Sequence, residues 1–225
     1  DPANGTPANV LPERSANLEV GVKSYLLDRK LLLNANLYRT RVDDYQAVTS
    51  VPDATSPTGF SSVLGNIPGI RARGIELDGA FTVTPNLQFT FGAAYNDAVY
   101  TDWATATCPR SAPASVTVCD NTGRQIVGAP KWTGIVGVDY AFSFVGGFMG
   151  HVFATHTYRS EHNLEQLLSP YGWQGDYTLT DVGVGFSRDV RGLTYEVNLV
   201  GKNVFGTRYT TSVNDFSNNA PVGFD

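Results

Sequence analysis

The feature that most constrains the fold is a series of short segments in which apolar and polar residues alternate. Residues 87–95 read LQFTFGAAY, and residues 31–37, 132–142 and 193–199 show the same pattern. A period of two places successive side chains on opposite faces of a β-sheet. The connections between these segments are alternately tight and long, so one rim of the sheet carries turns and the other carries loops. This asymmetry is typical of a transmembrane β-barrel.

The alternation predicts eight antiparallel strands joined in sequence. Their expected ranges are 17–26, 31–38, 70–83, 87–95, 132–144, 148–159, 177–188 and 193–203. Tight turns are expected at 28–30, 84–86, 146–147 and 189–192, and long polar loops at 43–66, 96–130 and 160–176. Residues 135–154 form the most apolar stretch, but Asp139, His151 and Gly146-Gly147 interrupt it, which favours two strands around a turn over a membrane helix.

Alternation alone does not separate a membrane barrel from a soluble β-sandwich, because both have one apolar face. The charged fraction is 16%, below the typical soluble value of about 25%, and aromatic residues make up 12% of the chain. The residues expected near strand ends include several aromatics that fit an interfacial girdle: Trp132, Phe144, Phe148, Tyr158, Phe205 and Tyr209. The net charge of −5 argues against a nucleic-acid partner, which needs a basic surface.

Two arginines interrupt the apolar face of the third expected strand. Arg71 and Arg73 have the same parity as Ile75 and Leu77, and arginine facing lipid is costly at mid-membrane and cheap near the interface. We therefore expect either that both lie above the membrane, or that a β-bulge near Gly74 shifts the phase of the strand.

The chain has two cysteines, Cys108 and Cys119, inside one polar segment rich in Pro, Ser, Thr and Asp. A small loop closed by a disulfide is the favoured interpretation, and it implies an oxidising compartment. A metal site is disfavoured, because the spacing is not C-x-x-C and no histidine is near in sequence. His151 and His156, five residues apart, would lie on opposite faces of one strand and so could not share a metal. Asp43-Asp44 could bind calcium, although a solvated acidic pair is favoured.

Four segments resemble those of TonB-dependent outer-membrane receptors. Residues 12–23 (PERSANLEVGVK) resemble the family's strand opening PE-x-S-x-N-x-E-x-G-x-K, and residues 72–78 (ARGIELD) resemble its SRGVELE strand. Residues 128–132 (GAPKW) resemble its NAPK entry to a strand, and residues 201–209 (GKNVFGTRY) its VKNLFDKRY segment. The four segments occur in the family's order and cover most of the chain.

The resemblance implies that residues 1–225 are a C-terminal section of an all-β, antiparallel transmembrane barrel of the plugged, 22-stranded type. It places the plug domain and one final strand outside this chain, so the chain is expected to be part of a larger receptor. The implied function is uptake of a scarce ligand, most often a ferric siderophore, across the bacterial outer membrane. The implied partners are outer-membrane lipid, the ligand, and the TonB complex, which supplies energy through the plug.

Ligand contacts, if the lumen carries recognition, are expected among polar or aromatic residues near the outer rim: Tyr38, Asn96, Tyr158, Arg159 and Trp173. Membrane anchoring or loop packing is the alternative role for each. No catalytic motif, cofactor motif or metal site is found in the sequence, so an enzyme is disfavoured. A passive porin-like or structural barrel is the main alternative function, and a soluble β-sandwich binding module is the third.

Overall fold

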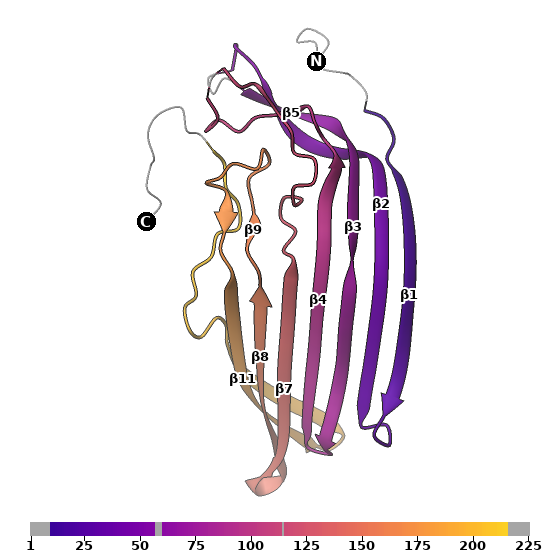
Figure 1. Ribbon diagram of the computed structural model, residues 1–225. Helices are drawn as coiled ribbons and strands as arrows, with labels where there is room; N and C mark the ends of the chain where they lie inside the picture. Colours follow the sequence, from indigo (N-terminus) through magenta and orange to yellow (C-terminus); the bar gives the residue numbers. More distant parts are fainter. Residues whose placement is uncertain (1–9, 57–59, 114, 216–225) are drawn as a thin grey trace.

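The computed structural model describes residues 10–56, 60–113 and 115–215, and its main feature is one antiparallel sheet in which each strand pairs with the next long strand in the chain (Figure 1). The sheet has eight strands in the order β1-β2-β3-β4-β7-β8-β11-β12. Their bounds are β1 Arg14–Leu26, β2 Leu31–Pro52, β3 Phe60–Thr84, β4 Leu87–Asp102, β7 Trp132–Phe144, β8 Phe148–Arg159, β11 Tyr177–Val190 and β12 Leu193–Gly201. All eight predicted strands are therefore confirmed, together with the tight turns between them.

The remaining elements are small. The 3-10 turn η2 (Val145–Gly147) joins β7 to β8 at the predicted Gly-Gly turn. Two short ribbons lie in the long connections, formed by β5 (Ala106–Thr107) with β6 (Val118–Cys119), and by β9 (His162–Asn163) with β10 (Trp173–Gln174). No helix among the described residues is long and apolar enough to cross a membrane. We call the edge with the tight turns the turn rim and the opposite edge the loop rim.

The predicted loop at residues 43–66 is wrong, because β2 and β3 continue as a paired hairpin through most of it. Pairing runs without a change of register from Leu31↔Phe81 to Pro52↔Phe60. The Ser- and Thr-rich composition suggested a loop, but a strand beyond the membrane needs no continuous apolar face, and the ladder satisfies its backbone groups. The pairing is interrupted only between Asp43↔Gly69 and Tyr45↔Ile67, where Asp44 has a φ of 56° and Pro68 has no N–H to donate. The hairpin bends near the loop rim of the sheet (Figure 1). β4 likewise extends to Asp102, beyond its expected end at Tyr95.

Regular pairing fixes which side chains share a face. Leu37 lies opposite Val20 and Ile75, and Ile75 lies opposite Tyr95, so one face collects the apolar members of each alternating segment. We call this the apolar face. The other face, which we call the polar face, carries the intervening residues, such as Asn36 opposite Gly21 and Glu76.

The apolar face is not covered by any described part of the chain. Its residues are among the most exposed large hydrophobics, including Leu18 at 68%, Val20 at 65% and Leu199 at 74% exposure. A soluble β-sandwich would bury this face against a second sheet. A barrel wall instead presents it to lipid, so the structure supports the membrane barrel.

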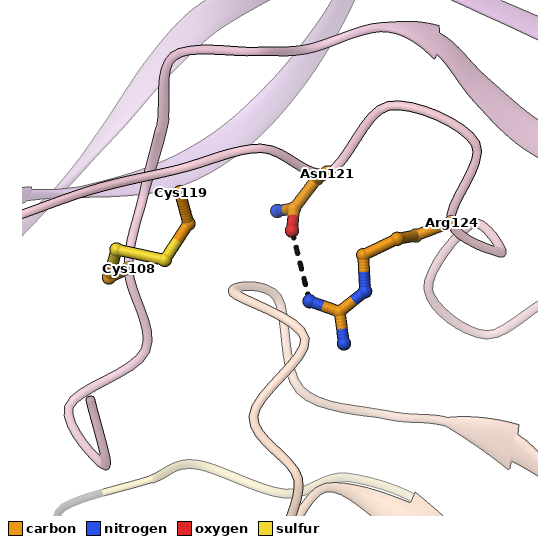
Figure 2. Close-up of a disulfide and its surroundings, with 4 residues drawn as sticks. All are labelled: Cys108, Cys119, Asn121 and Arg124. Atoms are coloured by element: carbon orange, nitrogen blue, oxygen red, sulfur yellow. Dashed lines mark hydrogen bonds between the residues drawn. A yellow bond between two sulfur atoms is a disulfide. The ribbon is translucent and has the colours of Figure 1, made fainter.

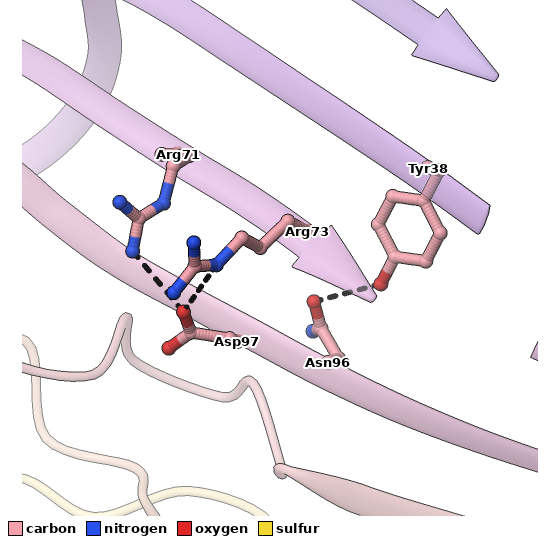
Figure 3. A network of polar contacts seen from close by, with 5 residues as sticks. All are labelled: Tyr38, Arg71, Arg73, Asn96 and Asp97. Carbon is pink, nitrogen blue, oxygen red and sulfur yellow. Dashed lines mark hydrogen bonds and ion pairs between the residues drawn. The ribbon is translucent and has the colours of Figure 1, made fainter. Parts of the chain in front are cut away.

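The polar face carries a series of hydrogen bonds between neighbouring strands. Asn36 donates to Glu19 at 2.6 Å, and Asn34 donates to Asp78 at 2.8 Å. Nearer the loop rim the Tyr38 hydroxyl donates to Asn96 Oδ1 at 2.8 Å, across Gly74 of the strand between them (Figure 3). These pairs hold polar side chains in fixed positions on the face opposite the lipid.

Arg71 and Arg73 remain on the apolar face, beyond Ile75 in the direction of the loop rim. The alternative of a β-bulge near Gly74 is wrong, because β3 pairs regularly with both neighbours from Ile70 to Phe81. The register shift on the β4 side lies between Gly69 and Ile70, closer to the loop rim. The arginines therefore mark the end of the apolar band and do not shift the phase of the strand.

Gly74 provides a test of this packing. A Cβ atom there would overlap the Tyr95 carbonyl oxygen and lie 2.8 Å from the Tyr38 hydroxyl, so a side chain forces the pair Tyr38–Asn96 apart. We expect Gly74→Ala to lower the unfolding free energy by about 1–3 kcal/mol, the usual cost of overpacking. Gly134→Ala is the matched control, because the nearest atom to its Cβ would be a carbonyl oxygen at 3.9 Å. Urea unfolding of the full-length receptor in detergent measures both, and equal midpoints would contradict the prediction.

Candidate functional site

The loop rim carries the main hydrophobic core of the described chain. Residues 103–131 and 160–176, which we call the loop cap, pack with the bent β2–β3 hairpin. The core consists of Ile67, Ile70, Tyr100, Trp103, Ala106 and Leu168. Ile70 and Tyr100 are paired across β3 and β4 and have the parity of the polar face, so the cap leans on that face. The Tyr100 and Trp103 rings lie 4.6 Å apart at its centre.

The first half of the loop cap is closed by a disulfide. Cys108, which follows β5, is bonded to Cys119 of β6, with their Cα atoms 5.0 Å apart (Figure 2). Asn121 follows the disulfide and is fully buried. Its backbone N–H donates to the Trp103 carbonyl, and its Oδ1 accepts from Arg124 at 3.1 Å. Covalent and polar links thus hold this loop in one shape although it contains little regular structure.

The second half of the loop cap is organised around a buried carboxylate. Glu165 is 7% exposed, and its Oε2 accepts the backbone N–H groups of Leu167 at 2.8 Å and Ser169 at 3.0 Å. Asn163 binds both sides of the same turn, because its Oδ1 accepts from the Glu165 N–H and its Nδ2 donates to the Ser169 carbonyl. Burial raises the pKa of Glu165, and the hydrogen bonds from Ser169 and Leu167 oppose this.

The two halves of the loop cap are connected to each other. The Gly128 N–H donates to the Asn163 carbonyl at 2.8 Å, and the hydroxyls of Ser111 and Ser169 are 3.4 Å apart. Leu168 of the second half belongs to the same core as Trp103 of the first half. The cap is therefore one packed unit at the mouth of the sheet.

The five residues predicted as ligand contacts do not form one cluster. Tyr38 and Asn96 are hydrogen-bonded on the polar face. Arg159 ends β8 on the same face, opposite Thr133 and Tyr177, and it is exposed with no ion pair to any described residue. Tyr158 precedes it and so points to the apolar face, where a girdle position is the simpler role. Trp173 lies in the β9–β10 ribbon of the loop cap and is 46% exposed.

Sequence reasoning missed the buried polar residues of the loop cap. Asn121, Asn163, Glu165 and Ser169 are each 7% exposed or less, yet they lie in segments whose composition predicted solvated loops. No periodicity marks them, because their burial depends on two loops meeting. In the part of the chain described, no three His, Cys, Asp or Glu side chains are placed to hold a metal ion.

Comparison with known proteins identifies the architecture. A family model described as "TonB dependent receptor-like, beta-barrel" matches residues 1–219. Comparison by sequence with curated proteins gave no match.

Several solved structures share the fold. The ferric yersiniabactin uptake receptor FyuA from Yersinia pestis is similar at 17% identity and a TM-score of 0.67, over 89% of this chain and 26% of that one. The siderophore receptor PiuA from Acinetobacter baumannii is similar at 20% identity and a TM-score of 0.65, over 96% of this chain and 28% of that one. The copper transporter OprC is similar at 16% identity and a TM-score of 0.62, over 92% of this chain and 28% of that one. The chain spans about a quarter of the length of these proteins, and at such identities the likeness shows the fold alone.

The disulfide yields a direct prediction. Under non-reducing conditions, mass spectrometry of a protease digest should find one peptide pair linked through Cys108 and Cys119. Replacing both with serine should destabilise the loop by about 2–4 kcal/mol, because the cross-link restricts the unfolded loop. Amide hydrogen exchange across residues 103–125 measures this effect. Two free thiols in the oxidised protein, or unchanged exchange in the double variant, would contradict the assignment.

The buried Glu165 predicts an unusual pH dependence for the loop cap. Its pKa is higher in the folded cap than in the unfolded segment, so the folded cap binds a proton more readily. Stability of the cap should therefore fall as pH rises from the ordinary carboxyl range through the raised pKa. Protection factors at Leu167 and Ser169, corrected for intrinsic exchange, should show this decline, and Glu165→Gln should abolish it while keeping an oxygen acceptor. A variant with the same pH dependence as the wild type would refute this role.

Proposed function

Because the chain belongs to the family of TonB-dependent receptor β-barrels, we propose that it is part of an outer-membrane receptor that imports a scarce ligand, a ferric siderophore. Energy for import would come from the inner-membrane TonB complex, acting through a plug domain inside the barrel. The solved relatives include siderophore receptors and a copper transporter. The proposal assigns this chain an outer-membrane location and a transport role without catalysis.

The observation that carries the proposal is the division of the wall into two unlike faces beneath a folded cap. The apolar face is uncovered, as lipid contact requires, while the polar face holds ordered Asn, Glu, Asp and Tyr side chains. A polar inner face suits a lumen through which a hydrophilic complex passes. The loop rim would face the outside, because outer-membrane barrels carry their long loops there and their short turns on the periplasmic side.

The loop cap favours capture over free diffusion. A passive pore needs an open mouth, whereas here two loops pack into one unit on the polar face, held by a disulfide and by a buried polar cluster. Such a unit can present fixed side chains to a ligand at the entrance. Arg159 lies on the polar face at the end of β8 next to this unit, and it is exposed and has no ion pair with a described residue. It is therefore placed to bind an anionic ligand such as a ferric chelate.

Uptake by the full-length receptor tests this function. Cells that depend on it for a radiolabelled ferric siderophore should lose accumulation when TonB is removed. Arg159→Gln should weaken binding by about ten- to a hundredfold, since losing one charge-assisted hydrogen bond costs about 1.5–3 kcal/mol. Arg188→Gln, on the opposite face at the turn rim, is the matched control and should transport normally.

The outcomes separate the candidate functions. Accumulation that persists without TonB would replace active import with a passive barrel. Loss of binding in Arg159→Gln together with normal binding in Arg188→Gln would support a ligand path along the polar face. Equal binding by both variants would exclude Arg159 from that path. Folded state in each case is checked by the heat-dependent shift in electrophoretic mobility that intact barrels show.

A further inference from the structure

Four arginines form a cluster on the apolar face near the loop rim. Arg39 of β2 lies directly opposite Arg73 of β3, and two residues nearer the loop rim Arg41 lies directly opposite Arg71. We call a set of residues that face one another across neighbouring strands a row. All four have the parity of Leu37 and Ile75, so they point toward the side that the proposed function assigns to lipid. We call these residues the arginine cluster.

The neighbouring row indicates how deep in the membrane the arginine cluster lies. One row toward the turn rim lie Leu37, Ile75 and Tyr95, followed by Trp132 of β7. The Tyr95 and Trp132 rings are 4.7 Å apart, an aromatic pair of the kind found where hydrocarbon meets headgroups. The arginine cluster therefore lies immediately outside the hydrocarbon, at the level of the outer headgroups.

The cluster has more positive charge than its surroundings neutralise. Its two rows hold four guanidinium groups and one carboxylate, Asp97, whose Oδ2 accepts from Arg71 at 3.1 Å and Arg73 at 2.9 Å (Figure 3). The next row toward the loop rim adds Arg14, Asp43 and Asp102 around Gly69. Over the three rows, positive charges still exceed negative ones by two.

Direct opposition of like charges is normally avoided in a sheet, because it destabilises the strand pair. Here it occurs twice in succession, at Arg39↔Arg73 and Arg41↔Arg71. Asp97 is paired with Arg71 and Arg73, and Asp43 is paired with Arg41 at 2.9 Å. Arg39 is exposed and has no ion pair among the described residues, and the Arg73 side chain remains 58% exposed beside Asp97. Arg39 and Arg73 can therefore both reach a further anion.

The turn rim provides a contrast on the same face. Arg188 of β11 points outward there and lies opposite Tyr195, with its guanidinium 4.9 Å from the centre of the Phe148 ring. It has no arginine opposite it in β12, so like charges are not paired. The clustering is thus a feature of the loop rim and not of every interfacial arginine.

We propose that the arginine cluster binds the phosphate groups of a phosphorylated lipid in the outer leaflet. Guanidinium forms paired, charge-assisted hydrogen bonds to phosphate oxygens. Adjacent guanidiniums therefore favour a phosphorylated headgroup over a neutral one. The lipid-facing direction and headgroup depth select a membrane lipid over a soluble anion. This inference rests on the membrane placement in the proposed function, and not on the identity of the transported ligand.

Binding of a defined lipid to the full-length receptor in detergent tests the proposal. The probe is bis-phosphorylated lipid A, followed by native mass spectrometry, with the dephosphorylated lipid and inorganic phosphate as comparisons. Arg39→Gln combined with Arg73→Gln should weaken binding of the phosphorylated lipid at least tenfold. Arg188→Gln should leave it unchanged, and inorganic phosphate at millimolar concentration should displace little lipid because it lacks acyl chains.

Three results would overturn the proposal. The first is equal binding of the phosphorylated and dephosphorylated lipids to the wild-type receptor, which needs no variant to fold. The second is unchanged lipid binding in a folded double variant. The third is displacement of the lipid by millimolar inorganic phosphate, which would assign the cluster to soluble anions instead. Ferric-siderophore binding is measured on the same samples, so failure of ligand binding with intact lipid binding counts against the proposed function alone.

Discussion

The structure depends on an antiparallel hydrogen-bond ladder that stays in register across the sheet's membrane band. Where strands cross a bilayer, no water is present to satisfy unpaired N–H and C=O groups, so each strand must be paired along its length. β2 is paired with β3 from Leu31 to Pro52, and β7 with β8 from Thr133 to Phe144. Because the register does not shift within the apolar band, parity alone decides whether a side chain meets lipid or lumen. A slip of one residue would exchange the two faces.

Two different kinds of stabilisation follow from this ladder. Among the described residues, the apolar face of the wall has no packed hydrophobic core, and its large side chains are exposed. The loop cap is the opposite, since it buries Trp103, Tyr100 and Leu168 together and satisfies Asn163 and Glu165 by hydrogen bonds. The arginine cluster lies where these regions meet. Its residues are too polar for hydrocarbon and lie outside the cap, at the depth where anionic headgroups can neutralise them.

The sequence predicted the strands best where lipid contact imposes strict alternation. In β7 and β8 the expected bounds match the structure residue for residue, because almost every outward position there is apolar, aromatic or glycine. His156 is the polar exception, and it is hydrogen-bonded to Thr180. Prediction failed above the membrane. Residues 43–66 looked like a loop, since a strand in water tolerates Ser, Thr and Asp, and the pairing of Gln46 with Asn66 leaves no apolar signal. Of the ligand-contact candidates, Tyr38 and Asn96 meet on the polar face, whereas the adjacent Tyr158 and Arg159 point to opposite faces, and their role in ligand binding stays a prediction.

By itself, the sequence determined the antiparallel wall, its eight strands and the difference between its two rims, because period-two alternation and turn residues are local properties. Tertiary structure decided whether the apolar face is covered, which loops pack together, and which charges meet across strands. Asp97 joins Arg71 and Arg73 from a segment 24 to 26 residues away, and Glu165 is buried by neighbours that no local pattern predicts. These features arise from the meeting of distant segments, so no period in the chain encodes them.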